Sequence, residues 1–423
     1  MKKTKIFSTL MATAFAFLFA VSPVNASSEE AKENTKENET LDVADGTEVV
    51  FWHAMNAEQG KELEKLTKDF MKKYPNVKIT LQNQTDYGSL SQKLVATSQS
   101  PKDLPTITQA YPNWLYDMIS HDMVVDLTDK VKTDITDWDL VVEGLRNGVT
   151  IDSKVYGIPF NKSTEVIWYN KDVFDKAGVE VPKTFEELKE VSKKITEKTG
   201  MVACGFDSLT NFFEAYLNSK GIAFDEKVDF SSPEVLEAVN YYIDGIKEGY
   251  FRIAGTDKYL SGPMSNEQLA MYIGSNAGET YVKEGAEGKF DYEVAPYPSE
   301  SSIQQGTDLY MFSNATEDQQ KAALAYMNFL ISKDNQIEWG IKTGYIPVKT
   351  SAIEDEKYTK SDSKIAGVLK DATKSLFSAP VKKGSQQAYN DVGSMLEQLL
   401  SNPKNDVEKT LKDFQSTYDS AWK

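Results

Sequence analysis

The sequence predicts an α/β fold with a mostly parallel sheet that is covered by helices. Two short β-rich runs, at residues 47–51 and 77–81, enclose a segment over 58–73 whose apolar residues recur at helical spacing. A second helical pattern, over 88–98, leads to a further strand-like run at 106–110. Strands that alternate with helices in this way are typical of parallel sheets, because each helix returns the chain across a face of the sheet.

The middle of the chain continues the alternation. Residues 155–160 are expected to form an extended crossover segment, followed by a strand over 165–169 and a short helix over 171–178. The next helix is predicted to begin at a capping box, in which Thr184 is the N-cap and Glu187 lies three residues later.

Helices predominate in the last third of the chain. Residues 234–247 carry an amphipathic helical pattern, and strands are expected over 269–273 and 291–296. The sequence contains no internal repeat of the length found in solenoids. The C-terminal helices are predicted over residues 317–332, 335–341, 365–377, 386–401 and 405–421.

The N-terminus has the pattern of a secretory signal peptide over residues 1–26. Three lysines precede an apolar run over residues 6–21, and Val24-Asn25-Ala26 resembles a cleavage site. The apolar run is short for crossing a bilayer core of about 30 Å. Ser27 follows the cleavage site, where a lipoprotein needs a cysteine. We therefore expect a soluble, exported protein, located in the periplasm or outside the cell, that is not a lipoprotein.

Composition separates a polar leader from the folded body. Residues 27–46 are rich in Glu, Lys, Asn, Ser and Thr, and we expect them to be a disordered leader because they offer little apolar surface to bury. The only cysteine, Cys204, is expected to be buried, so no internal disulfide is predicted.

The charge balance excludes several kinds of partner. The chain has a formal net charge of −17, and removal of the three signal-peptide lysines leaves 64 acidic residues against 44 basic ones. Such a surplus argues against nucleic acids and anionic membrane surfaces as partners. Arg146 and Arg252 are the only arginines.

Aromatic and hydroxyl residues gather where predicted strands end. Trp52, His53, Tyr87 and Tyr111 fall near the carboxyl ends of strands, where ligands bind on parallel sheets. Rings and hydroxyls suit a sugar or polyol, because they offer both an apolar face and hydrogen bonds. The segments with this character are 51–55, 159–164, 168–174 and 342–347.

Each aromatic candidate also has a structural interpretation. Trp52 and Trp114 are either stacking platforms for a sugar ring or core residues, whereas Trp168 lies inside a strand and is more consistent with core. His53 either bonds a ligand or caps the following helix. With only His53 and His121 in the chain, and His121 expected in an exposed loop, neither a metal site nor a cofactor is predicted.

The order and spacing of these segments resemble the extracellular solute-binding proteins of carbohydrate-type ABC importers (family 1), most closely their glycerol-3-phosphate-binding branch. The resemblance extends from about residue 48 to the C-terminus. The matching motifs are Phe51-Trp52-His53-x-Met55 with Gly60-Lys61-Glu62, Pro159-Phe160-Asn161-x-Ser163-Thr164, Tyr169-Asn170-Lys171-Asp172-x-Phe174-x-Lys176-Ala177-Gly178, Pro182-Lys183-Thr184 and Lys342-Thr343-Gly344-Tyr345-x-Pro347.

The resemblance implies a two-lobe periplasmic-binding-protein fold, with the ligand cleft between the lobes and hinge crossovers joining them. Lobe I would comprise residues 47–155 and about 305–358, and lobe II residues 156–304 and about 359–423. Closure on the ligand would be a hinge motion. The closed protein, expected to be a monomer, would dock on the transmembrane subunits of an ABC permease.

The resemblance also implies a set of ligand contacts, namely Tyr87, Ser163, Ser275, Gly306 and Tyr345. These residue types suit polyols, because hydroxyls donate and accept hydrogen bonds and a glycine permits close approach of the backbone.

Two positions depart from the family pattern. Pro112 stands where the family has a glutamate, and Asn390 where it has an arginine. A guanidinium is the natural partner of a phosphate, so a phosphorylated ligand would require Lys162, Lys382 or Lys383 instead.

The sequence thus predicts the solute-binding subunit of an ABC importer that captures glycerol-3-phosphate or a related glycerol phosphodiester. The alternative is the same role for a neutral sugar or oligosaccharide. A secreted glycoside hydrolase is a remote alternative, because such enzymes need only two suitably placed carboxylates. No acidic residue stands in a recognisable catalytic context, so the chain is not expected to be an enzyme.

Overall fold

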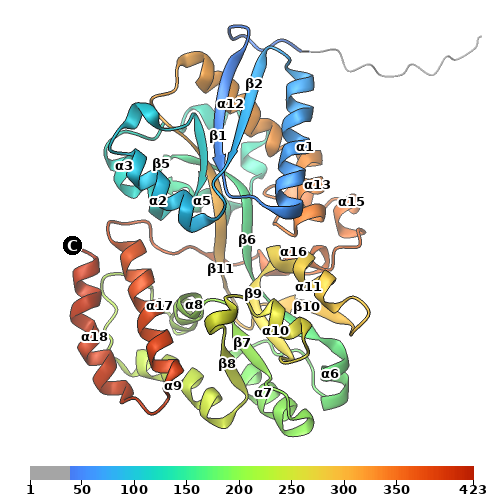
Figure 1. The fold of residues 1–423 in the computed structure, drawn as a ribbon, viewed down its shortest axis with the longest axis vertical. Coiled ribbons are helices and arrows are strands. Elements are labelled where there is room, and N and C mark those ends of the chain that lie inside the picture. The colour runs from blue at the N-terminus through green and yellow to red at the C-terminus, as the bar shows by residue number, and fades with distance from the viewer. Residues whose placement is uncertain (1–38) are drawn as a thin grey trace, which may run out of the picture. The chain divides into compact units, whose positions relative to one another are not determined.

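The computed structural model describes residues 39–423 (Figure 1). The predicted signal peptide and most of the predicted leader lie outside the described residues. Residues 39–46, the last part of that leader, contact the folded body. The Glu39 N–H donates to the Lys73 carbonyl (2.9 Å) and the Leu41 N–H donates to Asn76 Oδ1 (3.2 Å). No helix between residues 39 and 423 combines the length and apolar character needed to cross a membrane.

A single sheet of ten strands organises the described chain. Its strands follow the order β2-β1-β3-β11-β6-β9-β7-β8, with β10 also paired to β6 and β12 to β11. The bounds are β1 Thr47–His53, β2 Val77–Asn83, β3 Ile107–Ala110, β6 Gly157–Asn170, β7 Cys204–Phe206, β8 Phe251–Ile253, β9 Met271–Ser275, β10 Tyr292–Pro296, β11 Ser302–Met311 and β12 Leu376–Phe377.

The sheet consists of two parallel groups that are joined by antiparallel strands. β1 pairs in parallel with β2 and β3 at one end, and β7 pairs in parallel with β8 and β9 at the other. Between them, β6 and β11 pair antiparallel with each other, and Figure 1 shows both strands running from one half of the body into the other. The prediction of an α/β, two-lobe fold is confirmed, and β6 and β11 are the crossovers between the lobes.

β6 is longer than the sequence analysis predicted. The expected crossover segment and the strand after it form one strand of 14 residues, of which all but Tyr169 are buried. One part of β6 pairs with β11, and Glu165–Tyr169 pair with β9. The partner strand β11 was not predicted, and its register shifts between Thr307 and Asp308, an irregularity of the kind often found beside binding sites.

Most of the predicted helices are present within a few residues of the expected ends. Helix α7 begins as predicted, with the Thr184 hydroxyl accepting the Glu187 N–H (3.1 Å). The other half of the capping box is absent, because the Glu187 carboxylate accepts from Lys183 N–H instead (2.7 Å). The main helices are α1 Ala57–Lys73, α2 Tyr87–Thr97, α6 Lys171–Ala177, α7 Phe185–Thr199, α8 Leu209–Ser219, α9 Pro233–Glu248, α11 Glu279–Ala286, α12 Glu317–Leu330, α13 Lys333–Thr343, α17 Ser385–Ser401 and α18 Val407–Ala421.

The prediction of one helix over 365–377 is wrong. That segment contains a 3-10 turn at Ile365–Gly367, the short helix α16 (Leu369–Ala372) and the strand β12. Pairing of Leu376 and Phe377 with β11 requires extended backbone, so tertiary contact overrides the helical pattern there. Helix α8 was not predicted.

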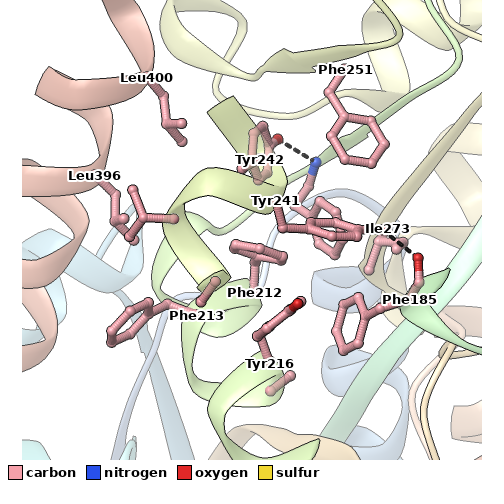
Figure 2. Close-up of a cluster of buried hydrophobic side chains, with 14 of the residues drawn as sticks. Phe185, Phe212, Phe213, Tyr216, Tyr241, Tyr242, Phe251, Ile273, Leu396 and Leu400 are labelled. Atoms are coloured by element: carbon pink, nitrogen blue, oxygen red, sulfur yellow. Dashed lines mark hydrogen bonds between the residues drawn. The ribbon is translucent and has the colours of Figure 1, made fainter. Parts of the chain in front are cut away.

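Separate hydrophobic cores support the two ends of the sheet. Figure 2 shows part of the core around α8 and α9, where Phe212 packs against Tyr241 and Tyr242 and the Tyr241 hydroxyl donates to the Phe185 carbonyl (2.7 Å). Cys204 is buried in this core, as predicted. Trp168 is fully buried in another core cluster, which confirms its interpretation as a core residue.

Candidate ligand-binding site

A cavity of about 550 Å³ lies beside the crossover strands, where residues from both ends of the sheet meet. We call it the main cavity. Tyr87, Ser163, Ser275, Gly306 and Tyr345, the five contacts implied by the family resemblance, all line it. The structure thus brings together residues that are more than 250 positions apart in the sequence.

Two tyrosines form one wall of the main cavity. Tyr87 is the first residue of α2, which begins at the N-cap Asp86, and Tyr345 follows the left-handed glycine that ends α13. Their hydroxyls lie 3.2 Å apart. The ring of Tyr345 stacks on Trp339 at 5.9 Å with an interplanar angle of 7°, so this residue belongs to the core as well as to the cavity.

The crossover strands form the floor. Ser163 lies on β6. Gly306 lies on β11, where it pairs with Lys162 of β6. Gly306 has a φ of +84°, and a Cβ atom there would lie 2.2 Å from the carbonyl oxygen of Asn161. Only glycine permits this close approach of the two backbones. Ser275 ends β9, and its hydroxyl accepts the Ala277 N–H (3.2 Å).

Two acidic residues that the sequence analysis did not identify also line the main cavity. Glu165 on β6 accepts hydrogen bonds from Asn211 Nδ2 (2.9 Å) and Gln305 Nε2 (3.3 Å). Asp207 accepts the Leu260 N–H at 2.7 Å. Burial raises the pKa of Glu165 to about 8 and that of Asp207 to about 7. Neither carboxyl therefore offers a full negative charge at neutral pH.

Five further tyrosines line the main cavity, and the sequence analysis identified one of them, Tyr111, as a residue near a strand end. Tyr259 and Tyr281 are 67% and 52% exposed, which places their rings at the mouth of the cavity. Tyr111, Tyr272 and Tyr389 lie deeper. Among the described residues, no lysine or arginine lines the main cavity.

Two predicted site residues lie in the core instead. Trp52 packs in a hydrophobic cluster, donates from Nε1 to Gln82 Oε1 (2.9 Å) and has the Lys93 ammonium 3.8 Å from its ring centre. His53 is buried and accepts the Met55 N–H at Nδ1 (3.2 Å). Burial lowers the pKa of His53 to about 4. His53 does not cap helix α1, because Met55 precedes the N-cap residue Asn56 and no side chain caps this helix. Neither Trp52 nor His53 lines the main cavity.

The predicted site residue in the C-terminal helices, Asn390, does not line the main cavity, but the residue before it, Tyr389, does. Asn390 is exposed on α17 and accepts from Gln386 Nε2 (2.9 Å). Its neighbour Tyr389 lines the main cavity and donates its hydroxyl to Asn211 Oδ1 (2.9 Å). One residue is about 100° around a helix, so the two side chains point in different directions.

Trp114 lines an adjoining cavity of about 520 Å³, which we call the second cavity, together with Pro112, Lys162 and Lys382. Lys162 is buried and forms an ion pair with Asp308 (2.9 Å), while Lys382 pairs with Glu226 (2.9 Å).

Lys383 donates to the carbonyl of Lys423. The three lysines considered for a phosphate therefore all have other partners and do not line the main cavity. Within residues 39–423, no group of three or more His, Cys, Asp or Glu residues is arranged to hold a metal ion.

Comparison with known proteins identifies the family. Residues 65–366 match the family model of the bacterial extracellular solute-binding proteins. The chain belongs to this family. Its role is that of the solute-binding subunit of an ABC importer, and its family and relatives are binding proteins of transport systems.

Curated relatives extend over most of the chain. The chain is 26% identical over 336 residues to the sn-glycerol-3-phosphate-binding periplasmic protein UgpB of Pectobacterium atrosepticum, covering 73% of this chain and 74% of that protein. It is 29% identical to UgpB of Brucella melitensis, covering 75% of this chain and 77% of that protein.

Solved structures show the same fold. UgpB from Mycobacterium tuberculosis, in complex with glycerophosphocholine, has a TM-score of 0.79 at 20% identity and covers 89% of this chain and 98% of its own. Maltose-bound MalE3 of T. maritima has a TM-score of 0.77 at 18% identity and covers 89% of this chain and 100% of its own.

Proposed function

We propose that this family member captures an uncharged, hydroxyl-rich solute, a sugar or polyol, in the main cavity. The observation that carries the proposal is the lining itself. It combines tyrosine rings, hydroxyls and amides with two carboxyl groups, and none of its described residues is a lysine or arginine. Aromatic rings pack on the apolar faces of sugars. Amide and carboxyl groups form hydrogen bonds with the sugar hydroxyls, as donors or as acceptors.

A phosphate monoester fits this lining poorly. Its charge would require cationic partners, since charge-assisted hydrogen bonds are the usual means of phosphate recognition. The nearest predicted cation, Lys162, is already paired with Asp308 and Gly306. When Glu165 and Asp207 are ionised, their negative charges would repel a phosphate bound in the main cavity.

A glycerol phosphodiester is the second candidate. The curated relatives are named for glycerol-3-phosphate, and one similar structure contains glycerophosphocholine. The five contacts implied by the resemblance all line the main cavity, which supports a retained polyol subsite. A diester carries a single negative charge and would need fewer cationic partners than glycerol-3-phosphate.

The remaining features of the proposed role follow from the family. The relatives are named periplasmic proteins, which supports an extracytoplasmic location. We propose that the protein acts as a monomer, that the two lobes close over the ligand by bending at β6 and β11, and that the closed form docks on a permease.

A thermal-shift screen of the protein from Ser27 onward tests the proposal. The compounds are glycerol-3-phosphate, glycerophosphodiesters, maltodextrins and common disaccharides. At a concentration 100 times Kd, a ligand of the folded state adds about 2.7 kcal/mol to the free energy of unfolding. A shift with neutral sugars alone supports the proposal, whereas a shift with the phosphate compounds alone refutes it in favour of the second candidate. Chromatography of the ligand recovered after incubation distinguishes a binding protein from a hydrolase, because a hydrolase would convert the ligand to shorter products.

A further inference from the structure

A chain of hydrogen bonds joins five side chains that all line the main cavity. The hydroxyls of Ser208 and Tyr389 lie 2.9 Å apart, and Tyr389 donates to Asn211 Oδ1 (2.9 Å). Asn211 Nδ2 in turn donates to Glu165 Oε1 (2.9 Å), and Gln305 Nε2 donates to the same oxygen (3.3 Å). The carboxyl group of Glu165 is therefore the point at which these hydrogen bonds converge.

The directions of these bonds decide which oxygen of Glu165 can carry a proton. The carbonyl oxygen of Asn211 already accepts from Tyr389, so its amide nitrogen faces Glu165 as a donor. Gln305 also faces Glu165 with its nitrogen. Because Oε1 accepts from both amides, a proton on this carboxyl belongs on Oε2.

Oε2 of Glu165 has no hydrogen-bond partner among residues 39–423, although the side chain is only 2% exposed. A buried polar atom without a partner costs free energy, so nearly all such atoms are hydrogen-bonded in folded proteins. Glu165 lines the main cavity, and a solute bound there can provide the missing partner.

The surroundings of Glu165 favour the protonated form. Burial is the main cause that raises its pKa to about 8, and the nearby carboxyl of Asp207 adds to the shift. The strands beside it contribute the uncharged residues Ser275 on β9 and Gln305 on β11. The titratable groups that act on Glu165 from the other neighbouring segments are all acids or phenols, namely Asp207 before α8, Glu214 on α8, Tyr297 between β10 and β11, and Tyr389 on α17.

We infer that Glu165 is a specificity-determining residue, and that its Oε2–H donates a hydrogen bond to an acceptor oxygen of the solute bound in the main cavity. The acceptor is a hydroxyl, ring or glycosidic oxygen. Ionisation of the carboxyl removes this donor, so the protein binds its solute in the protonated form and releases it as Glu165 loses its proton. The inference rests on the proposed function and adds to it the residue that couples solute binding to pH.

The test measures Kd by isothermal titration calorimetry at pH 6, 7, 8 and 9, with maltose, maltotriose, cellobiose, lactose and sucrose as probes. For a sugar that binds, Kd is expected to be about tenfold larger at pH 9 than at pH 6, because about one tenth of the Glu165 carboxyl groups keep their proton one unit above a pKa of about 8. A Kd that stays constant from pH 6 to pH 9 would show that the inference is wrong, although the proposed function stands. If none of these sugars binds at any pH, the proposed function fails and the inference with it.

Glu165→Gln distinguishes a donor from an acceptor. Its amide can still accept from Asn211 and Gln305 through Oε1, and it can donate from Nε2 at every pH. We expect a Kd within about threefold of the wild type at pH 6 and no change up to pH 9. Glu165→Leu removes the donor and should raise Kd about tenfold or more at pH 6. Should the leucine variant fail to fold, the pH profiles of the wild type and of Glu165→Gln decide the matter.

Glu214→Gln is the matched control. Glu214 is buried on α8 and its pKa is also raised to about 8, but its side chain does not line the main cavity. Asp207→Asn is a second control, because it removes the other carboxyl of the lining. Both variants should keep the loss of affinity between pH 6 and pH 9. A loss that persists in Glu165→Gln, or that disappears in either control, would assign the pH dependence to another group and overturn the inference.

Discussion

Glu214 provides a sharp test of the electrostatics beneath the binding site. It lies on α8 one turn after Asn211, and it is only 1% exposed. Neither carboxylate oxygen has a hydrogen-bond partner among the described residues. Burial, with a smaller contribution from the nearby Glu165, raises its pKa from the ordinary 4.5 to about 8. We predict that replacing this group by glutamine changes how stability depends on pH.

The sign follows from proton linkage. The folded state holds the Glu214 proton up to a pH of about 8, whereas the unfolded state releases it near the ordinary value of 4.5. Between these values the unfolded state binds fewer protons, so the free energy of unfolding falls as pH rises. The stabilisation is fully present below pH 4.5 and is lost by about pH 8.

The magnitude comes from the same shift. One pKa unit corresponds to about 1.36 kcal/mol, so the interval from pH 5 to pH 8 costs the wild-type protein about 3 kcal/mol through this group alone. In Glu214→Gln this contribution is absent. The difference in free energy of unfolding, variant minus wild type, should therefore be about 3 kcal/mol larger at pH 8 than at pH 5.

The assay is urea unfolding of both proteins at pH 5 and pH 8, with the slope of the transition compared as well. Comparing differences between two pH values cancels any fixed cost of burying the glutamine amide. Glu197→Gln on the exposed face of α7 is the control and should show no such dependence. Parallel pH dependence of wild type and Glu214→Gln would refute the reasoning.

Three further predictions concern the cavity walls. Gly306→Ala should lower the free energy of unfolding by more than about 1 kcal/mol and abolish ligand binding, because its Cβ meets the backbone of β6; a urea midpoint equal to that of the wild type would contradict the role of this glycine. Tyr345→Phe keeps the stacked ring but removes the hydroxyl beside Tyr87, so calorimetry should show about tenfold weaker binding and a stability change within about 1 kcal/mol; unchanged Kd would remove the hydroxyl pair from the site. Lys258→Gly should raise the free energy of unfolding by about 1 kcal/mol, since Lys258 has a strained φ of 62° and ψ of −46° in the tight turn before Tyr259; a loss of stability measured in urea would show that the turn is not strained.

Much of the candidate site could be predicted because its residues occur in recognisable local contexts. Tyr87 follows the N-cap of a helix, and Tyr345 follows the glycine that ends another helix. The local sequence therefore indicates that each tyrosine stands at a helix end. The resemblance then supplied Ser163, Ser275 and Gly306, and the structure places all of these along one cavity.

The polar residues of the second lobe could not be found in this way. Glu165 lies within a strand that is buried along almost its whole length, and nothing in its local sequence distinguishes a cavity-lining carboxyl from a structural one. Asp207 precedes α8, a helix that was not predicted. Both became candidates only when the fold placed them in one cavity lining with Tyr389, which lies 224 residues after Glu165 and 182 residues after Asp207.

The sequence by itself determined the class of the fold, because alternating apolar patterns and helix caps depend on local backbone geometry. It also determined that His53 and Trp52 follow the first strand pattern, but not which way they face. The tertiary structure decided that they pack in the core and that Tyr389, rather than Asn390, lines the main cavity. The physical reason is that a cavity is made by surfaces from distant segments, and one residue of register on a strand or helix turns a side chain from one surface to another.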